Sequence, residues 1–248
     1  MTYCLGMLVQ GGLIMMADTR TNAGVDNISS YRKLRVFGGD GKRLIVVCSA
    51  GNLSTSQGAL QRMMRGVPNP ETLEMDSWQS VPSIYEAARA AGRAIRLARD
   101  GNDSLDQSAG VNFDASLLVG GAIDGEAHRL FLVYSEGNVI ECGPDTPYLQ
   151  IGEAKYGKPM LDRALRFETT PEEALKIGLI SFDATMRANL AVGLPIDILV
   201  SRAGGARIDV QHRIEPSDAY FRDLSQRWAD AMIAAVDGVP LPPYAGPA

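Results

Sequence analysis

The order of strand-like and helix-like segments is the feature that most restricts how this chain can fold. Apolar runs of strand length occur in blocks, and pairs of segments with helical periodicity separate the blocks. A parallel sheet would need a crossover, usually a helix, between consecutive strands, so this order disfavours it. The order favours an α+β fold, in which two antiparallel sheets pack together between outer helix layers. We therefore predict a four-layer αββα sandwich.

The element boundaries follow from hydrophobic periodicity and from turn residues. The predicted strands are 2–9, 13–19, 33–37, 43–49, 115–123, 129–134, 138–142, 148–151, 196–201 and 206–210, the last two forming a pair. The predicted helices are 53–64, 83–99, 155–167, 171–191 and 221–236, with a polar loop over 100–110. We expect one domain over 1–236, ending in an extra C-terminal helix, and an extended Pro-rich tail over 237–248.

Composition excludes several classes of function. Hydrophobic residues make up 46% and charged residues 21%, which is ordinary for a globular protein. The net charge of −5 gives no basic footprint for nucleic acid. No apolar run of about 18 residues is present, so no membrane span is predicted. The first residues lack the basic and apolar pattern of a signal peptide, so we expect a cytoplasmic protein.

Cysteine and histidine usage predicts neither a metal nor another cofactor. Cys4, Cys48 and Cys142 lie on separate predicted strands without CxxC spacing, which disfavours both a disulfide framework and a zinc site. We interpret them as buried small hydrophobes, including Cys4, although it is close to the start of the chain. His128 and His212 are far apart in polar surroundings and are expected at the surface.

Thr2 is a candidate nucleophile. Removal of Met1, which a small second residue permits, would leave a threonine that carries both a hydroxyl and a free α-amine. An α-amine loses its proton near neutral pH, so it can act as the base for its own hydroxyl. By itself this signal is weak, because many chains begin Met-Thr without any chemical consequence.

The predicted first hairpin supports this interpretation. It returns the end of its second strand, at Asp18, to the neighbourhood of Thr2. A carboxylate at the edge of an apolar ladder needs a cation, and Lys33 begins the next strand. A fixed ammonium there would assist deprotonation of the threonine hydroxyl. Taken singly, Asp18 could be a strand-end charge and Lys33 a solvated lysine.

Three segments carry a resemblance to a known family: "GGLIMMADTRTNAG", "YRKLRVF" and "VVCSAGNLSTSQ". Together with the early threonine, they resemble the first third of proteasome β-subunits and of bacterial HslV, which are N-terminal nucleophile hydrolases. The resemblance implies a threonine-type peptidase acting on peptides or proteins. It assigns Thr2 as nucleophile, Asp18 and Lys33 as its partners, and the N–H of Gly51 as donor to the oxyanion. A helix start after Gly51 would also suit a negative charge.

The chain resembles one bacterial branch of that family, Anbu, more closely still. "IGEAKYGKPMLDR" (151–163) and "NLAVGLPIDILV" (189–200) carry this likeness, which extends over the whole chain. It implies a homo-oligomer in the form of a ring, a lock-washer or a helix. Whether an ATPase partner exists, and how many subunits assemble, stays open.

The chain also departs from the family pattern. The spacing from Asp18 to Lys33 is one residue shorter than in ordinary proteasome subunits. The family's Ser-Gly pair, which supports the threonine amine, falls near Glu153-Ala154. Its later Asp and Ser fall near Asn189 and Ala191. Two alternatives therefore stay open: a non-proteolytic amidase or acyl-transfer enzyme, and a catalytically silent assembly subunit.

Substrate specificity can be predicted only by analogy of strand position. On that basis Thr21, Tyr31, Arg35 and Ser49 are expected to line the specificity pocket. These side chains favour no simple hydrophobic residue.

Overall fold

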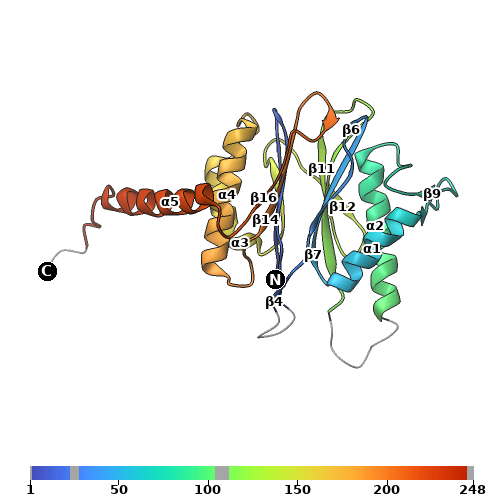
Figure 1. The fold of residues 1–248 in the computed structure, drawn as a ribbon, viewed down its shortest axis with the longest axis horizontal. Coiled ribbons are helices and arrows are strands. Elements are labelled where there is room, and N and C mark those ends of the chain that lie inside the picture. Colours follow the sequence, from blue (N-terminus) through green and yellow to red (C-terminus); the bar gives the residue numbers. More distant parts are fainter. Residues whose placement is uncertain (1, 23–27, 104–111, 245–248) are drawn as a thin grey trace.

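Two antiparallel sheets form the centre of the computed structural model, which describes residues 2–22, 28–103 and 112–244 (Figure 1). The first sheet has the order β13-β1-β2-β14-β16, and the second has the order β12-β11-β10-β7-β5. The first sheet contains β1 (Tyr3–Val9), β2 (Gly12–Asp18), β13 (Tyr148–Gly152), β14 (Ile196–Arg202) and β16 (Val210–Ile214). The second contains β5 (Leu34–Gly38), β7 (Arg43–Gly51), β10 (Ala115–Ile123), β11 (Arg129–Val133) and β12 (Val139–Glu141).

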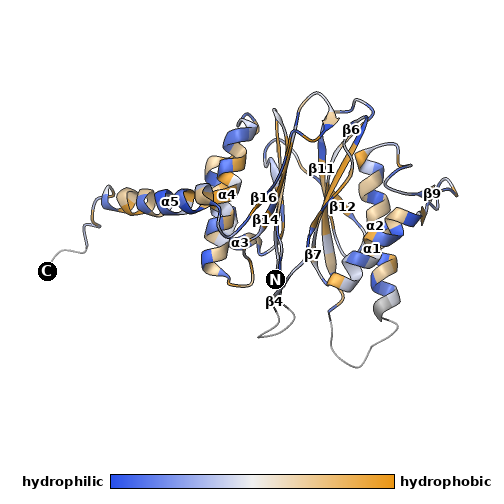
Figure 2. Ribbon diagram, viewed as in Figure 1, coloured by the Kyte–Doolittle hydropathy of each residue, from blue (hydrophilic) through white to orange (hydrophobic). Residues whose placement is uncertain are grey.

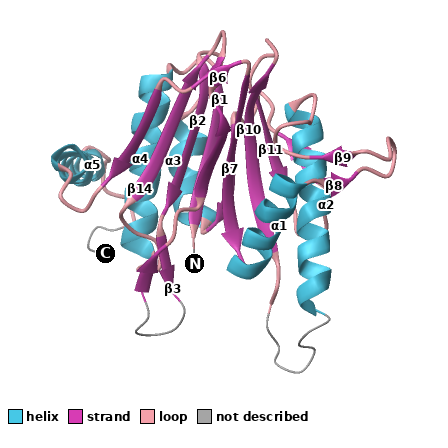
Figure 3. Ribbon diagram, turned by 45° about the vertical axis from the view of Figure 1, so that its right-hand side comes forward, coloured by secondary structure: helices cyan, strands magenta, loops and turns pink. Residues whose placement is uncertain are grey.

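Helices cover the outer face of each sheet (Figures 1 and 3). Helices α1 (Leu53–Arg65) and α2 (Ile84–Asp103) pack on the second sheet, and α3 (Ala154–Ala164) and α4 (Pro171–Ala188) cover the first. Helix α5 (Ala219–Asp237) contacts α4 and extends away from the layers. The predicted α+β fold, an αββα sandwich of two antiparallel sheets, is confirmed.

The core is divided into three apolar clusters, one at each boundary between layers. Strand β2 shows why its sequence is apolar throughout. Its side chains alternate in direction, as in any strand. Ile14 and Met16 pack in the cluster beside α4, whereas Leu13, Met15 and Ala17 pack between the two sheets. Figure 2 shows the resulting hydrophobic colouring along the central strands.

The hairpin of β1 and β2 brings the start of β1 beside the end of β2. Its register pairs Cys4 with Ala17, so the chain at Asp18 returns beside Tyr3. The Tyr3 N–H donates to Asp18 Oδ1 at 3.0 Å. The Tyr3 hydroxyl lies 2.6 Å from Ser181 Oγ of α4. The residue that follows Thr2 is therefore held both by its backbone N–H and by its side chain.

One predicted strand pair is wrong in its details. Strand β14 pairs with β16, not with 206–210. Instead β15 (Ala206–Arg207) forms a separate small sheet with β6 (Asp40–Gly41). The turn between β14 and β16 is longer than predicted, and the hydrogen bonds of Asp209 link its two ends. The Asp209 N–H donates to Val200 O at 2.9 Å, and the Asp209 carboxylate accepts the Arg202 N–H at 2.6 Å.

Several element ends also differ from the predictions. Helix α3 ends at Ala164, three residues before the predicted end, and the Phe167 carbonyl instead accepts the Gln10 N–H at 2.7 Å. Helix α4 ends at Ala188, because Asn189 is extended and its side chain accepts the Ala191 N–H.

Helix α2 continues to Asp103, so the start of the predicted loop is helical, and positions 104–110 of that loop lie outside the described residues. Positions 245–248 of the predicted tail are likewise not described. Two short strand pairs were not predicted: β3 (Arg20–Asn22) with β4 (Ile28–Ser30), and β8 (Val67–Pro68) with β9 (Met75–Asp76).

The cysteines and histidines show one further difference. All three cysteines are buried and free, as the sequence predicted. His128, expected at the surface, is partly buried, and its Nε2 lies 2.8 Å from Ser201 Oγ. Within the described ranges, no group of three or more potential ligand side chains could hold a metal, and no helix is long and apolar enough to cross a membrane.

Candidate active site

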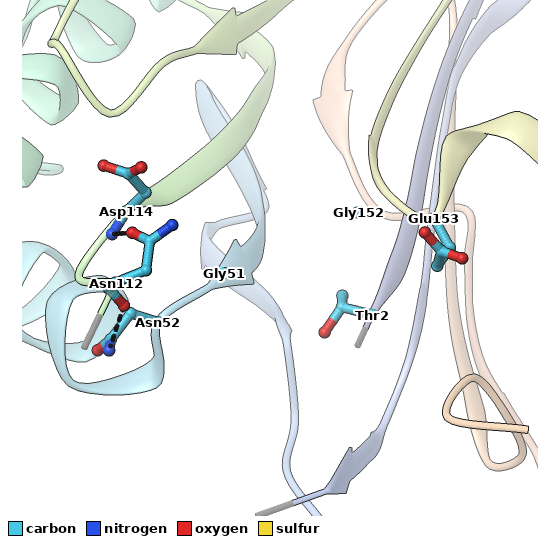
Figure 4. Close-up of a pocket in the computed structure, with 7 residues that line it drawn as sticks. All are labelled: Thr2, Gly51, Asn52, Asn112, Asp114, Gly152 and Glu153. Atoms are coloured by element: carbon cyan, nitrogen blue, oxygen red, sulfur yellow. Dashed lines mark hydrogen bonds between the residues drawn. The ribbon is translucent and has the colours of Figure 1, made fainter. Parts of the chain in front are cut away.

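A cavity of about 640 Å³ lies where the two sheets come together at the start of β1 (Figure 4). Thr2 borders it from the first sheet, and Gly51, the last residue of β7, borders it from the second. The Thr2 side chain points into the space between them (Figure 4). The lining residues are Thr2, Gly51, Asn52, Asn112, Asp114, Gly152 and Glu153. Two of the four predicted site residues therefore share one cavity.

The other two, Asp18 and Lys33, are not among its lining residues and form a buried ion pair with each other. Lys33 Nζ lies 2.7 Å from Asp18 Oδ1, and the two side chains are 3% and 0% exposed. Burial raises the pKa of the Asp18 carboxyl above its usual value, and the Lys33 ammonium and the Tyr3 N–H partly offset that effect. A buried carboxylate without such partners would be strongly unfavourable.

The environment of Lys33 gives its ammonium a fixed position. Besides Asp18, Nζ donates to the Arg20 carbonyl at 2.6 Å. Its own backbone carbonyl accepts the Ser49 N–H at 3.2 Å, which ties the start of β5 to β7. A lysine ammonium has three donors. Among the described residues, Asp18 Oδ1 and the Arg20 carbonyl each accept a hydrogen bond from Nζ. One N–H of the ammonium therefore remains for a further acceptor.

Gly51 ends β7 in a backbone conformation that requires glycine. Its φ is +93°, and a Cβ there would lie 2.4 Å from the Asp114 carbonyl oxygen. Helix α1 begins immediately afterwards, with Asn52 as its N-cap accepting the Thr55 N–H at 3.1 Å. Backbone N–H groups at a helix start favour a negative charge nearby.

Amide side chains hold the wall of the cavity on the Gly51 side. Asn52 Nδ2 donates to the Asn112 carbonyl at 3.1 Å, and Asn112 Oδ1 accepts the Asp114 N–H at 2.7 Å. The Asp114 carboxylate accepts a hydrogen bond from Ser135 Oγ at 3.0 Å, and Arg99 lies 3.8 Å away. This wall is polar and bears one exposed carboxylate.

On the other side, Gly152 and Glu153 press directly against Thr2. The Glu153 N–H donates to the Thr2 carbonyl at 2.8 Å. Gly152 has φ of +83°, and a Cβ there would lie 1.9 Å from that same oxygen. The Glu153 carboxylate, 13% exposed, accepts a hydrogen bond from Asn189 Nδ2 at 2.6 Å. Sequence reasoning placed Glu153 and Asn189 in altered motifs but gave neither a role in the site.

The predicted specificity residues do not line this cavity. Tyr31 and Arg35 border a different cavity of about 580 Å³, between β5 and α1. Thr21 donates to the Ser29 carbonyl at 2.8 Å, and Ser49 is buried. The residues that do border the Thr2 cavity come from the start of α1 and from the segment before β10.

Comparison with known proteins agrees with the observed fold. Anbu from Yersinia bercovieri is 40% identical, with a TM-score of 0.86, covering 96% of this chain and 97% of that chain. A structure described as the helical assembly of the Anbu complex from Pseudomonas aeruginosa is 38% identical, with a TM-score of 0.89, covering 99% and 100%. Proteasome subunit beta 2 of Pyrobaculum aerophilum is 28% identical over 204 residues, which are 82% of this chain and 90% of that protein. None of the protein-family models compared with the chain matches it.

These likenesses define the class of protein as the proteasome β-subunit-like N-terminal nucleophile hydrolases. Within that class, the identity to solved Anbu structures over nearly the whole length shows the narrower group. The chain belongs to the Anbu family.

Proposed function

We propose that this chain is a threonine-type amide hydrolase that cleaves peptides or proteins, with Thr2 as its nucleophile after removal of Met1. Asp18 holds Lys33, Lys33 stabilises the Thr2 oxygen, and the Gly51 N–H stabilises the oxyanion. The observation that carries the proposal is the buried Asp18–Lys33 pair. The same Asp18 oxygen accepts the N–H of Tyr3, the residue that follows Thr2.

The reaction has two stages. Thr2 Oγ attacks the amide carbon and transfers its proton to the Thr2 α-amine, giving a tetrahedral oxyanion. The C–N bond then breaks, and the leaving amine takes that proton, which leaves an acyl ester on Thr2. Water attacks the ester with the α-amine again as base, releasing the carboxylic acid and the free threonine. Throughout, the third donor of Lys33 is assigned to Thr2 Oγ, where a positive charge favours the alkoxide.

Intact mass measured with and without an epoxyketone or vinyl-sulfone probe tests the nucleophile. The proposal expects a mass that lacks Met1 and gains one probe per chain. Thr2→Ala should neither label nor hydrolyse a fluorogenic peptide panel, while Thr2→Ser, which keeps a hydroxyl, should label. Full peptide hydrolysis by Thr2→Ala would refute the assignment.

A narrower amidase is the second candidate. It is favoured by Glu153 and Asn189, which stand where the family's supporting serine and aspartate are expected. Probe labelling of Thr2 without turnover of any peptide in the panel would support it. Turnover of unrelated peptides at comparable rates would count against it. Absence of labelling under every condition would instead favour an assembly subunit without activity.

We further propose that the chain forms a homo-oligomer. The P. aeruginosa relative is described as a helical assembly. In this chain, α5 carries exposed apolar side chains, including Ile233 and Val236, which are 63% and 71% exposed. Beside them lies a mostly apolar groove of about 700 Å³ between α3, α4 and α5. Exposed apolar surface of this kind is typical of contacts between proteins. Analytical ultracentrifugation should show large species that Ile233→Glu reduces in size, whereas a monomer at all concentrations would refute this part.

A further inference from the structure

Two carboxylate residues are tied to the Thr2-Tyr3 segment, Asp18 through the Tyr3 N–H and Glu153 through the Thr2 carbonyl, and they differ in how their charge is neutralised. Asp18 is paired with Lys33 in a fully buried contact. Glu153 contacts only one cation among the described residues, Lys155, at 3.8 Å, and the Lys155 side chain is 67% exposed. An exposed lysine at that distance is screened by water and neutralises little charge. Glu153 is therefore a mostly buried carboxylate without a firm counter-ion.

The Glu153 side chain is nevertheless held in one place. Asn189 Oδ1 accepts the Ala191 N–H at 2.9 Å, which fixes the orientation of its amide. Asn189 Nδ2 therefore points away from the Ala191 N–H, and it donates to Glu153 Oε2. The other oxygen, Oε1, accepts no hydrogen bond from the part of the chain that the structure describes. One carboxylate oxygen is thus left for a ligand beside the cavity.

The backbone places Glu153 next to Thr2. The Glu153 N–H binds the Thr2 carbonyl at 2.8 Å, so the two residues are directly opposite each other across the β1–β13 edge. Both line the same cavity (Figure 4). No lysine or arginine is among the described residues that line it. Among these lining residues, Thr2 can supply a positive charge through its α-ammonium once Met1 has been removed.

We propose that Glu153 is the counter-ion of the Thr2 α-ammonium and acts as a positioning residue for it, with Asn189 holding the carboxylate. An opposite charge a few ångströms away favours the protonated amine. The amine would then lose its proton at a higher pH than an ordinary chain terminus. The inference rests on the proposed function in one respect: only a free Thr2 has this amine.

Such an arrangement has a consequence for the chemistry. The proposed mechanism needs the neutral amine as base, so the charge of Glu153 withholds the base at neutral pH. Hydrolysis should therefore rise as the medium becomes alkaline. A substrate that brings its own cation to Glu153 would compete for the carboxylate and release the amine, which favours basic peptides near this wall.

Titration of the amine itself tests the proposal without relying on turnover. Folded chains with a free Thr2, verified by intact mass, are labelled briefly with acetic anhydride from pH 5 to pH 10. Peptide mapping then gives the midpoint of Thr2 α-amine labelling. Glu153→Gln should lower this midpoint by about one pH unit. Asn189→Ala, which keeps the charge but frees the carboxylate, should lower it less.

Asp114→Asn is the matched control, because it removes a carboxylate from the opposite wall of the same cavity. Its midpoint should move by less than half of the Glu153→Gln shift. Equal midpoints for Glu153→Gln and the unmodified chain would overturn the proposal. A downward shift in a chain that hydrolyses nothing would support the counter-ion while refuting the peptidase, so the two failures can be told apart.

Discussion

Replacing Lys33 by methionine would separate the two halves of the buried ion pair. The substitution keeps an unbranched apolar stem of similar length and removes the ammonium. Asp18, which is fully buried, would then retain the Tyr3 N–H as its donor and lose the 2.7 Å contact to Nζ. Removing one partner of a buried pair costs about 3 to 5 kcal/mol, because the remaining charge is left uncompensated. We expect a loss of this size in the free energy of unfolding at pH 7.

The pH dependence of that loss identifies its cause. Burial already raises the pKa of the Asp18 carboxyl, and Lys33 opposes this effect, so Lys33→Met should raise that pKa further. A raised pKa means that the folded state binds the proton more tightly than the unfolded state. Stability then falls as the pH rises from the ordinary aspartate value through the folded value. The destabilisation by Lys33→Met should therefore be smaller at pH 4 than at pH 7.

Urea unfolding followed by tryptophan fluorescence gives the four corners of a double-mutant cycle. Asp18→Asn alone should also be costly, since it leaves a buried ammonium unpaired. The double variant is neutral, so it should be more stable than either single variant, with a coupling energy of several kcal/mol. Single-variant losses below about 1 kcal/mol that simply add in the double variant would refute the reasoning.

Three further predictions concern the surroundings of the site. Gly152→Ala should destabilise the fold by several kcal/mol in urea unfolding, because its Cβ would lie 1.9 Å from the Thr2 carbonyl oxygen; Gly41→Ala, also at positive φ but with open space around it, should cost only about 1 kcal/mol. Burial lowers the pKa of His128, so stability should fall as the pH drops below about 6.5, and His128→Gln should lack that fall. Asn52→Ala should cost about 1 kcal/mol through loss of the α1 cap, while Asn52→Asp should retain it.

The first hairpin shows what the sequence could predict. Two apolar runs of equal length around the Gln10-Gly11 turn permit a single close pairing, and that pairing returns Asp18 to Tyr3. The layers were predictable for a related reason. Strands buried on both faces have continuous apolar sequences. The paired helices between the blocks of strands then favour two packed sheets with helices outside.

Elements without an apolar period escaped prediction. Strands β3 and β4 are short and mostly polar, so no apolar alternation marks them in the sequence. Their pairing continues in the hydrogen bond from the Tyr31 N–H to the Thr19 carbonyl at 2.7 Å. The partner of β14 was misassigned because 206–210 and β16 both come after the turn that follows β14, so either could pair with it. The contacts of Asp209 with Val200 and Arg202 decide between them, and sequence spacing does not reveal those contacts.

The contact between Glu153 and Asn189 is the part of the site that local sequence could not show. The residues are 36 positions apart, and they meet only because α3 and α4 pack side by side on the first sheet. Each belongs to a segment that carries the family resemblance, and that was the available signal. The segments alone could not show that one residue orients the other, since this depends on the Ala191 N–H that fixes the amide.

Asp18 and Glu153 place two different electrostatic demands on the same site. Asp18 is buried with its own lysine, so its charge is compensated before any substrate binds. Glu153 lies at the rim with one oxygen uncommitted, so its charge must be balanced by whatever cation arrives. A positive charge on the Thr2 amine satisfies Glu153 but removes the base, and a positive charge on a substrate satisfies it while leaving the base free. On this argument, the electrostatics that keep the resting site unreactive also make its activation depend on the charge of the substrate.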